Sequence, residues 1–204
     1  MKINKKKFIY LISPTKIRKS FYQDLTNVLK QRKVSFFQLR LKKESLKKKL
    51  IIGKKIKRIC NKFNVKFLVN DDVLLAKRLN ADGCHLGQKD MDVIKARKLI
   101  GSRIIGVTCH NSIKLAKVAV INKADYIALG GFNHSKTKKI KFKASTNLLR
   151  KVKKITKTPV VAIGGINSEN YKKLLLNKAN FLAISGYIWN NDKLKPIEAI
   201  KILK

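Results

Sequence analysis

Short apolar runs alternate with helical patterns eight times along this chain, and no other feature restricts its fold as strongly. Short apolar runs predict buried strands, whereas apolar residues at helical spacing predict amphipathic helices. A strand, a helix and a strand in that order form a parallel pair. The predicted strands cover residues 8–12, 35–42, 67–69, 84–87, 103–108, 126–130, 160–164 and 181–185. The predicted helices cover residues 14–31, a lysine-rich segment up to about residue 61, 72–80, 91–100, 112–121, 146–155, 168–176 and 196–203.

Eight strand–helix units without a linker or a low-complexity tract predict an α/β fold, a (β/α)8 TIM barrel, in a single domain of residues 1–204. The length of 204 residues and the apolar content of 45% allow one domain with a sizeable core. Barrels of this class have their active sites at the C-terminal ends of the strands. The polar residues that follow each predicted strand are therefore the candidates for a functional site.

Two aspartates follow neighbouring predicted strands, Asp71 after the third and Asp90 shortly after the fourth. In a parallel barrel both would lie at the same rim, together with the amide of Asn70. Magnesium is usually held by one or two carboxylates and by the phosphates of a substrate. The pattern therefore predicts a magnesium site for a phosphorylated substrate. The alternative is that Asp71 or Asp72 only caps the next helix.

Gln38, Arg40 and Lys42 alternate along the second predicted strand and therefore share one face, while Phe37 and Leu39 face the helices. Long polar side chains at a barrel rim are costly unless a polar or anionic group meets them. A guanidinium and an ammonium together can bind a diphosphate. The alternative is that Arg40 and Lys42 only reach the solvent.

A second phosphate site is indicated by residues 130–138, which combine small residues, hydroxyls and lysines in a way that suits a loop closing over a phosphate. The seventh and eighth predicted strands end in Gly164-Gly165 and Ser185-Gly186. In barrels, the loops after these two strands often bind phosphate with the N-terminus of a short helix. Glycine lets the backbone approach the phosphate closely.

The pairs Cys84-His85 and Cys109-His110 raise the alternatives of a zinc site and of a cysteine nucleophile. Adjacent strand residues face opposite sides, so if His85 and Thr108 face the barrel interior, both cysteines face the helices as small apolar fillers. This geometry favours neither alternative. Three cysteines, no secretory signal and no apolar run of membrane length predict free thiols and a cytoplasmic location without a membrane partner.

The formal net charge of +38, from 49 Lys and Arg against 11 Asp and Glu, suggests a nucleic-acid or membrane partner. However, the lysines are spread along nearly every segment, and most Phe and Tyr residues lie inside apolar runs rather than on exposed stacking surfaces. We therefore expect no nucleic-acid partner. A basic nucleic-acid-associated protein is the alternative from another functional class.

Seven motifs of this chain occur in a characteristic order and spacing. They are Gln38-Leu-Arg-Leu-Lys42, Val69-Asn-Asp71, Ala81-Asp-Gly-Cys-His-Leu-Gly-Gln-Lys-Asp90, Gly106-Val-Thr-Cys-His-Asn111, Ala124-Asp-Tyr126, Ser135-Lys-Thr-Lys138 and Val161-Ala-Ile-Gly-Gly-Ile166. Together they resemble the thiamine-phosphate synthases, from about residue 8 to residue 189.

The resemblance implies a condensation of 4-amino-5-hydroxymethyl-2-methylpyrimidine diphosphate with 4-methyl-5-(2-hydroxyethyl)thiazole phosphate, in which diphosphate departs and the thiazole nitrogen captures a pyrimidine cation. It implies that Mg²⁺ is the cofactor, held by Asp71 and Asp90, and that the partners are small phosphorylated substrates. Arg40, Lys42 and Lys138 would be catalytic and neutralise the departing diphosphate. The substrate-binding residues would be Gln38, Arg40, Lys42, Asn70, His85, Thr108, Ser135, Thr137, Lys138, Gly165, Ile184 and Ser185.

Some residues depart from the family pattern. Thr108 stands where the family more often has Ser, and Ser135 stands where Thr is usual, but both keep a hydroxyl. The related thiazole tautomerases share the fold and tend to lack the magnesium carboxylates, so the presence of Asp71 and Asp90 favours the synthase. A tautomerase-like barrel that binds a thiazole phosphate without condensation is the nearest alternative. The oligomeric state is left open, and a homo-oligomer is compatible with the sequence.

Overall fold

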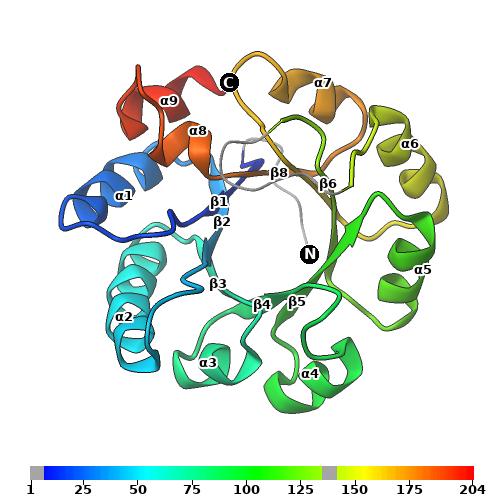
Figure 1. Ribbon diagram of the computed structural model, residues 1–204, viewed down its shortest axis with the longest axis horizontal. Coiled ribbons are helices and arrows are strands. Elements are labelled where there is room, and N and C mark those ends of the chain that lie inside the picture. The colour runs from blue at the N-terminus through cyan, green and yellow to red at the C-terminus, as the bar shows by residue number, and fades with distance from the viewer. Residues whose placement is uncertain (1–6, 135–141) are drawn as a thin grey trace.

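The computed structural model describes residues 7–134 and 142–204. Within these ranges, eight parallel strands close into a barrel in sequence order, and the last strand pairs with the first. Figure 1 shows this barrel at the centre, surrounded by an outer ring of helices. The prediction of a (β/α)8 TIM barrel is confirmed.

The elements follow one another in the predicted alternation. The strands are β1 (Ile9–Ile12), β2 (Val34–Leu39), β3 (Lys66–Asn70), β4 (Gly83–Leu86), β5 (Ile104–His110), β6 (Tyr126–Gly130), β7 (Val160–Ile163) and β8 (Phe181–Ile184). The helices are α1 (Phe21–Leu29), α2 (Leu46–Lys62), α3 (Val73–Arg78), α4 (Val93–Ile100), α5 (Ile113–Ile121), α6 (Thr146–Ile155), α7 (Tyr171–Leu176), α8 (Gly186–Trp189) and α9 (Pro196–Ile202).

Several predicted boundaries were wrong, among them the start of α7, which is Tyr171 rather than residue 168, and the end of β5, which is His110 rather than residue 108. Two further errors have identifiable reasons. Helix α1 begins at Phe21 rather than at residue 14, because the buried residues at helical spacing start only there, with Leu25 and Val28 following. Strand β2 ends at Leu39 rather than at residue 42, because its neighbours offer no further pairing beyond Ile12 and Val69. The short helix α8, which follows β8, was not predicted as an element.

The core has two layers that follow from the alternation of side chains along each strand. The outer layer lies between strands and helices, and it contains Phe37 and Leu39 as predicted. The inner layer fills the barrel. Its members are Tyr10, Ile12, Phe36, Leu68, Tyr126, Ala128, Val161, Phe181 and Ala183. None of the helices in the described part of the chain is long and apolar enough to cross a membrane.

Candidate active site

Asp71 and Asp90 meet at the C-terminal rim of the barrel. Asp71 follows β3 directly in a left-handed conformation, with φ at 64°, and its backbone N–H donates to the carbonyl of His85 at 2.8 Å. A non-glycine residue in this conformation is unusual, and such residues often occur at functional sites. Asp90 is held by the N–H of Gly87, which donates to its Oδ2 at 2.6 Å. The two carboxyl groups lie close enough for one to donate a hydrogen bond to the other when either is protonated.

Helix capping accounts for the neighbouring Asp72 rather than for Asp71. The Oδ1 of Asp72 accepts the N–H of Leu75 at 2.8 Å and so caps α3. The carboxylate of Asp71 instead forms an ion pair with Lys42, whose Nζ lies 3.0 Å from its Oδ2. Asp71 is therefore available to the rim, and the capping alternative holds only for Asp72.

The two rim carboxylates influence each other's protonation. Burial raises the pKa of Asp71, but hydrogen bonds from Lys42 and Asp90 outweigh it, and the pKa falls below its ordinary value. Burial raises the pKa of Asp90, and the neighbouring Asp71 holds it above its ordinary value. The two carboxylates therefore repel each other, and a divalent cation between them would relieve that repulsion. Two adjacent carboxylates at an open rim fit Mg²⁺, which takes its remaining oxygen ligands from substrate phosphate and water.

Three residues from the end of β2 lie at different depths. Gln38 is buried inside the barrel, Arg40 is half-buried, and the side chain of Lys42 is 58% exposed. A cavity of about 230 Å³ opens beside them between the ends of β2 and β3, and Lys42, Asn70 and Asp71 are among its lining residues. The structure therefore brings Lys42 to the predicted magnesium carboxylates and does not leave it only in solvent.

His85 and Thr108 face the barrel interior, as predicted. The ring of His85 makes hydrogen bonds to the Thr108 hydroxyl through Nε2 and to the Tyr126 hydroxyl through Nδ1, each at 2.8 Å. Burial lowers the pKa of His85 to about 4, so the imidazole is neutral at pH 7. Cys84 and Cys109 lie in the outer layer of the core.

Two tyrosines of the site were missed by the sequence analysis. The hydroxyl of Tyr10 lies 2.7 Å from that of Tyr126 and accepts a hydrogen bond from Gln38 Nε2 at 2.7 Å. Both tyrosines lie inside short apolar runs of the sequence, which predict buried strand residues without a polar role. Their position on the inward face of a strand was the available signal, because a buried hydroxyl there needs a polar partner.

The predicted phosphate-binding segments are only partly described. Gly165 adopts a φ of 56°, and a Cβ there would lie 2.0 Å from the carbonyl oxygen of His134, so a side chain would displace the loop. The carbonyl of Gly164 accepts the N–H of Asn133 at 3.1 Å, which holds this loop against the end of β7. Ile184 ends β8, and Ser185 precedes α8. Ser135, Thr137 and Lys138 lie outside the described residues.

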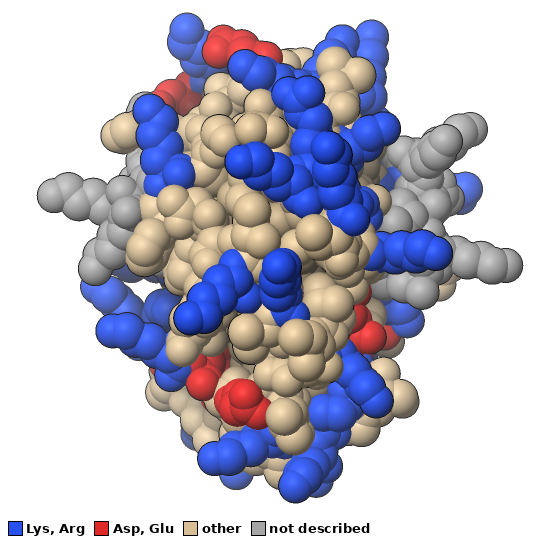
Figure 2. Space-filling view, turned by 90° about the vertical axis from the view of Figure 1, so that its right-hand side faces the viewer, with Lys and Arg blue, Asp and Glu red and all other residues tan. Residues whose placement is uncertain are grey.

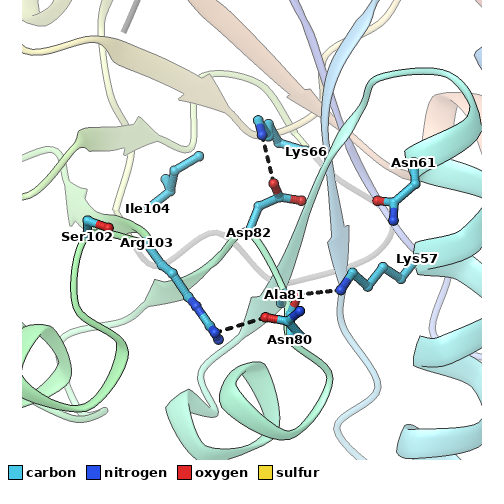
Figure 3. A pocket seen from close by; sticks show the side chains of 9 residues that line it. All are labelled: Lys57, Asn61, Lys66, Asn80, Ala81, Asp82, Ser102, Arg103 and Ile104. Atoms are coloured by element: carbon cyan, nitrogen blue, oxygen red, sulfur yellow. Dashed lines mark hydrogen bonds and ion pairs between the residues drawn. The ribbon is translucent and has the colours of Figure 1, made fainter.

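A cavity of about 560 Å³ lies at the opposite end of the barrel, where Lys57, Lys66, Asp82 and Arg103 line it (Figure 3). Lys66 pairs with Asp82, and Arg103 Nη2 donates to the Asn80 side chain at 2.9 Å. These contacts connect the N-terminal ends of neighbouring strands to one another and to the end of α3. In barrels of this class, that end serves stability rather than catalysis.

The fold and the rim together define a (β/α)8-barrel enzyme with a polar site at the C-terminal ends of its strands. Residues 9–188 match the thiamine monophosphate synthase family, and the chain belongs to this family. It is a transferase of thiamine biosynthesis.

Three relatives support this assignment. The chain is 69% identical to a thiamine-phosphate synthase of Pelagibacter ubique over 207 residues, covering 100% of both proteins. It is 39% identical to a thiamine-phosphate synthase of Erythrobacter litoralis over 196 residues, covering 94% of this chain and 92% of the relative. Among solved structures, a thiamine phosphate pyrophosphorylase from Pyrococcus furiosus matches with a TM-score of 0.85 and 27% identity, covering 98% and 94% of the two chains.

Proposed function

We propose that this protein joins 4-amino-5-hydroxymethyl-2-methylpyrimidine diphosphate to 4-methyl-5-(2-hydroxyethyl)thiazole phosphate and releases thiamine phosphate and diphosphate. The observation that carries this proposal is the pair of adjacent carboxylates, Asp71 and Asp90, beside Lys42 at the rim of a barrel of this family. Two carboxylates and a cation at one place suit a diphosphate that arrives with a divalent metal.

In this reaction the bond between the pyrimidine methylene carbon and the diphosphate oxygen breaks, and both electrons leave with diphosphate. The thiazole nitrogen then gives its lone pair to the methylene carbon. Asp71 and Asp90 would hold Mg²⁺, which supplies positive charge to the departing diphosphate. Arg40, Lys42 and Lys138 neutralise the remaining charge and so lower the energy of bond breaking. No protein nucleophile is needed.

The other predicted residues bind and orient the two substrates. Gln38, Asn70, His85 and Thr108 orient the pyrimidine and its diphosphate. Because His85 is neutral at pH 7, it adds no positive charge next to the developing pyrimidine cation. The thiazole phosphate is assigned to Ser135, Thr137 and Lys138, with the backbone groups of Gly165, Ile184 and Ser185.

The charge of the surface is the specific observation behind the nucleic-acid alternative. On the face drawn in Figure 2, Lys and Arg side chains are scattered from one end to the other, with uncharged residues between them, and form no single patch. On this face, the distribution supports a general attraction for small anions rather than a nucleic-acid groove. We further propose that residues 1–204 form one domain, that the enzyme works in the cytoplasm, and that its partners are small phosphorylated molecules.

The test is product formation by the purified protein. Both phosphorylated precursors and Mg²⁺ are supplied, and thiamine phosphate and diphosphate are measured together, because the condensation yields them in equal amounts. We expect product that disappears when a chelator is added and returns with excess Mg²⁺. The variants Asp71→Asn and Asp90→Asn should each lose about 100-fold or more in activity, because a neutral amide is a poor ligand for Mg²⁺.

The alternatives predict different outcomes. A folded, magnesium-replete wild type that makes no product but binds the thiazole phosphate would support the tautomerase-like barrel. Binding to nucleic acid that weakens steeply with salt and is unchanged in both aspartate variants would support the nucleic-acid reading. Diphosphate released in the absence of the thiazole substrate would report that the first bond breaks independently of capture.

A further inference from the structure

A continuous series of side-chain hydrogen bonds crosses the barrel interior from β2 to β5. It runs through Gln38, Tyr10, Tyr126, His85 and Thr108, which we call the interior chain, with heavy-atom distances of 2.7, 2.7, 2.8 and 2.8 Å in that order. Five different strands each contribute one member. Gln38, His85 and Thr108 are predicted substrate-binding residues, whereas the two tyrosines have no assigned role.

Among the described contacts, the hydroxyls of Tyr10 and Tyr126 make hydrogen bonds only to members of the interior chain. Tyr10 and Tyr126 are 1% and 0% exposed, and their rings pack against Phe36 in the inner core layer. Phenylalanine would fill the same volume there without the cost of burying a hydroxyl. Each hydroxyl therefore contributes less to packing than to the polar residues that it reaches.

The direction of the hydrogen bonds follows from a count of donors. Gln38 presents an amide N–H to Tyr10, and either tyrosine hydroxyl can be the donor between the two. Among the described contacts the Tyr10 proton has no other acceptor, so the order that leaves no buried proton unpaired has Tyr10 donate to Tyr126. Tyr126 accepts from Tyr10 and donates to Nδ1 of His85. The neutral ring then carries its proton on Nε2 and donates it to Thr108 Oγ1. The Thr108 hydroxyl has accepted one bond and keeps its own proton for an acceptor in the site.

Gly106 on β5 leaves space for the ring of Tyr126, which lies at the middle of the interior chain. A Cβ at Gly106 would lie 1.8 Å from Cζ of Tyr126, so any side chain there would displace the tyrosine ring. The rings of Tyr126 and His85 are nearly parallel, with an angle of 14° and centroids 5.6 Å apart. Backbone, ring packing and hydrogen bonding thus all hold the Tyr126 hydroxyl against His85.

We propose that Tyr10 and Tyr126 are positioning residues, which hold the proton of His85 on Nε2 and thereby aim the Thr108 hydroxyl as a donor at the pyrimidine diphosphate. This inference rests on the proposed function, because it names the substrate that accepts the hydrogen bond. The acceptor is a ring nitrogen or a diphosphate oxygen of that substrate. The thiazole phosphate is assigned to other residues, so its KM serves as an internal control.

The kinetic test is a double-mutant cycle with full-length protein and both substrates. Tyr126→Phe should lower kcat/KM for the pyrimidine diphosphate about tenfold, the effect of one hydrogen bond, and leave KM for the thiazole phosphate within about twofold. In a Thr108→Val background, which has no hydroxyl to aim, the same change should cost less than about twofold. An equal loss in both backgrounds would overturn the proposal, because it would mean that Tyr126 does not act through Thr108.

The matched control is Tyr171→Phe. Tyr171 is also buried, but its hydroxyl bonds to the backbone of Lys204, outside the barrel interior. The control should leave both KM values unchanged while costing similar stability. Should it lower kcat/KM for the pyrimidine diphosphate as much as Tyr126→Phe does, general loosening of the fold would replace positioning as the explanation.

A spectroscopic test separates this inference from the proposed function. In ¹⁵N-labelled wild type without substrate, the ring nitrogens of His85, one of three histidines, report which nitrogen carries the proton. We expect the proton on Nε2, and a shifted Nδ1 resonance in Tyr126→Phe because that nitrogen loses its donor. A proton on Nδ1 in the wild type would overturn the inference even if thiamine phosphate is made. Conversely, an inactive wild type with the proton on Nε2 would refute the proposed function and the named substrate while the hydrogen-bond order stands.

Discussion

Aspartates occupy both ends of this barrel, and their surroundings differ in a way that separates stability from catalysis. At the N-terminal end, Asp82 and Asp125 each accept a backbone N–H and pair with a cation, so each carboxylate is satisfied within the protein. At the C-terminal end, Asp71 pairs with Lys42 and Asp90 accepts the N–H of Gly87, but the two carboxyl groups also lie against each other. A carboxylate whose neighbour is another carboxylate is poorly used for folding and well placed for a cation that comes with substrate.

The N-terminal aspartates belong to a repeated clamp between neighbouring strands. Asp82, Asp125 and Asn180 precede the even-numbered strands β4, β6 and β8, and each makes two bonds to one residue of the preceding strand. The pairs are Asp82 with Phe67 at 2.9 and 2.9 Å, Asp125 with Ile105 at 2.8 and 2.8 Å, and Asn180 with Val160 at 2.8 and 2.8 Å. Asparagine serves as well as aspartate, so the clamp requires an oxygen acceptor rather than a charge.

Removing a clamp should produce the largest change in stability. Asp125→Ala leaves the buried N–H of Ile105 and the guanidinium of Arg97 without this partner, and it should lower the free energy of unfolding by about 2–3 kcal/mol. Asp125→Asn keeps the oxygen, as Asn180 does, and should lose only about 1 kcal/mol. Urea denaturation measures both. An equal loss in the two variants would place the stabilisation in the ion pair rather than in the backbone clamp.

A substitution at the C-terminal rim should raise, rather than lower, the free energy of unfolding of the metal-free protein. Asp90→Asn removes one of two adjacent carboxylates and offers Asp71 a permanent N–H donor, so the metal-free protein should gain about 0.5–1 kcal/mol in stability while losing activity. The measurement is urea denaturation in the presence of a chelator.

Addition of Mg²⁺ gives a second arm to this experiment. A metal that binds only the folded state stabilises the wild type in proportion to its concentration, and the variant should show much less of this effect. The control is Asp82→Asn at the other end, which should not gain stability. A metal-free Asp90→Asn that is less stable than wild type would show that the rim pair also contributes to folding.

Much of this architecture is predictable from the sequence because strand and helix periodicities are local. The order of eight strands and the inward positions of His85 and Thr108 follow directly from alternation along single strands. The placement of Asp71 and Asp90 at one rim follows from parallel topology and is consistent with the structure. The boundary errors at α1 and β2 arose because neighbouring elements, and not local composition, decide where pairing and burial stop.

Contacts between distant strands were not predictable in the same way. The hydrogen bond between Tyr10 and Tyr126 spans 116 positions. No local sequence pattern indicates that either hydroxyl makes a hydrogen bond inside the barrel. The motif Ala124-Asp-Tyr126 likewise contains two residues with different roles that its sequence does not reveal. Its aspartate binds the backbone of Ile105 at the N-terminal end of the barrel, whereas its tyrosine points into the interior and contacts His85. Such roles depend on register between strands, which one sequence does not specify.

Two matched ion pairs give the smallest expected change in stability and the sharpest contrast between the ends. Lys42 lies 3.0 Å from Asp71 with side-chain exposures of 58% and 28%, and Lys66 lies 2.8 Å from Asp82 with exposures of 59% and 24%. Exposed pairs of this kind stabilise little, so Lys42→Ala and Lys66→Ala should each change the free energy of unfolding by less than about 0.5 kcal/mol. Only Lys42→Ala should reduce product formation, by about tenfold or more, because only that ammonium lies beside the proposed diphosphate site. Equal activity losses in the two variants would mean that general positive charge, rather than the position of Lys42, serves the reaction, and a repeat at higher salt would then lower the wild-type rate as well.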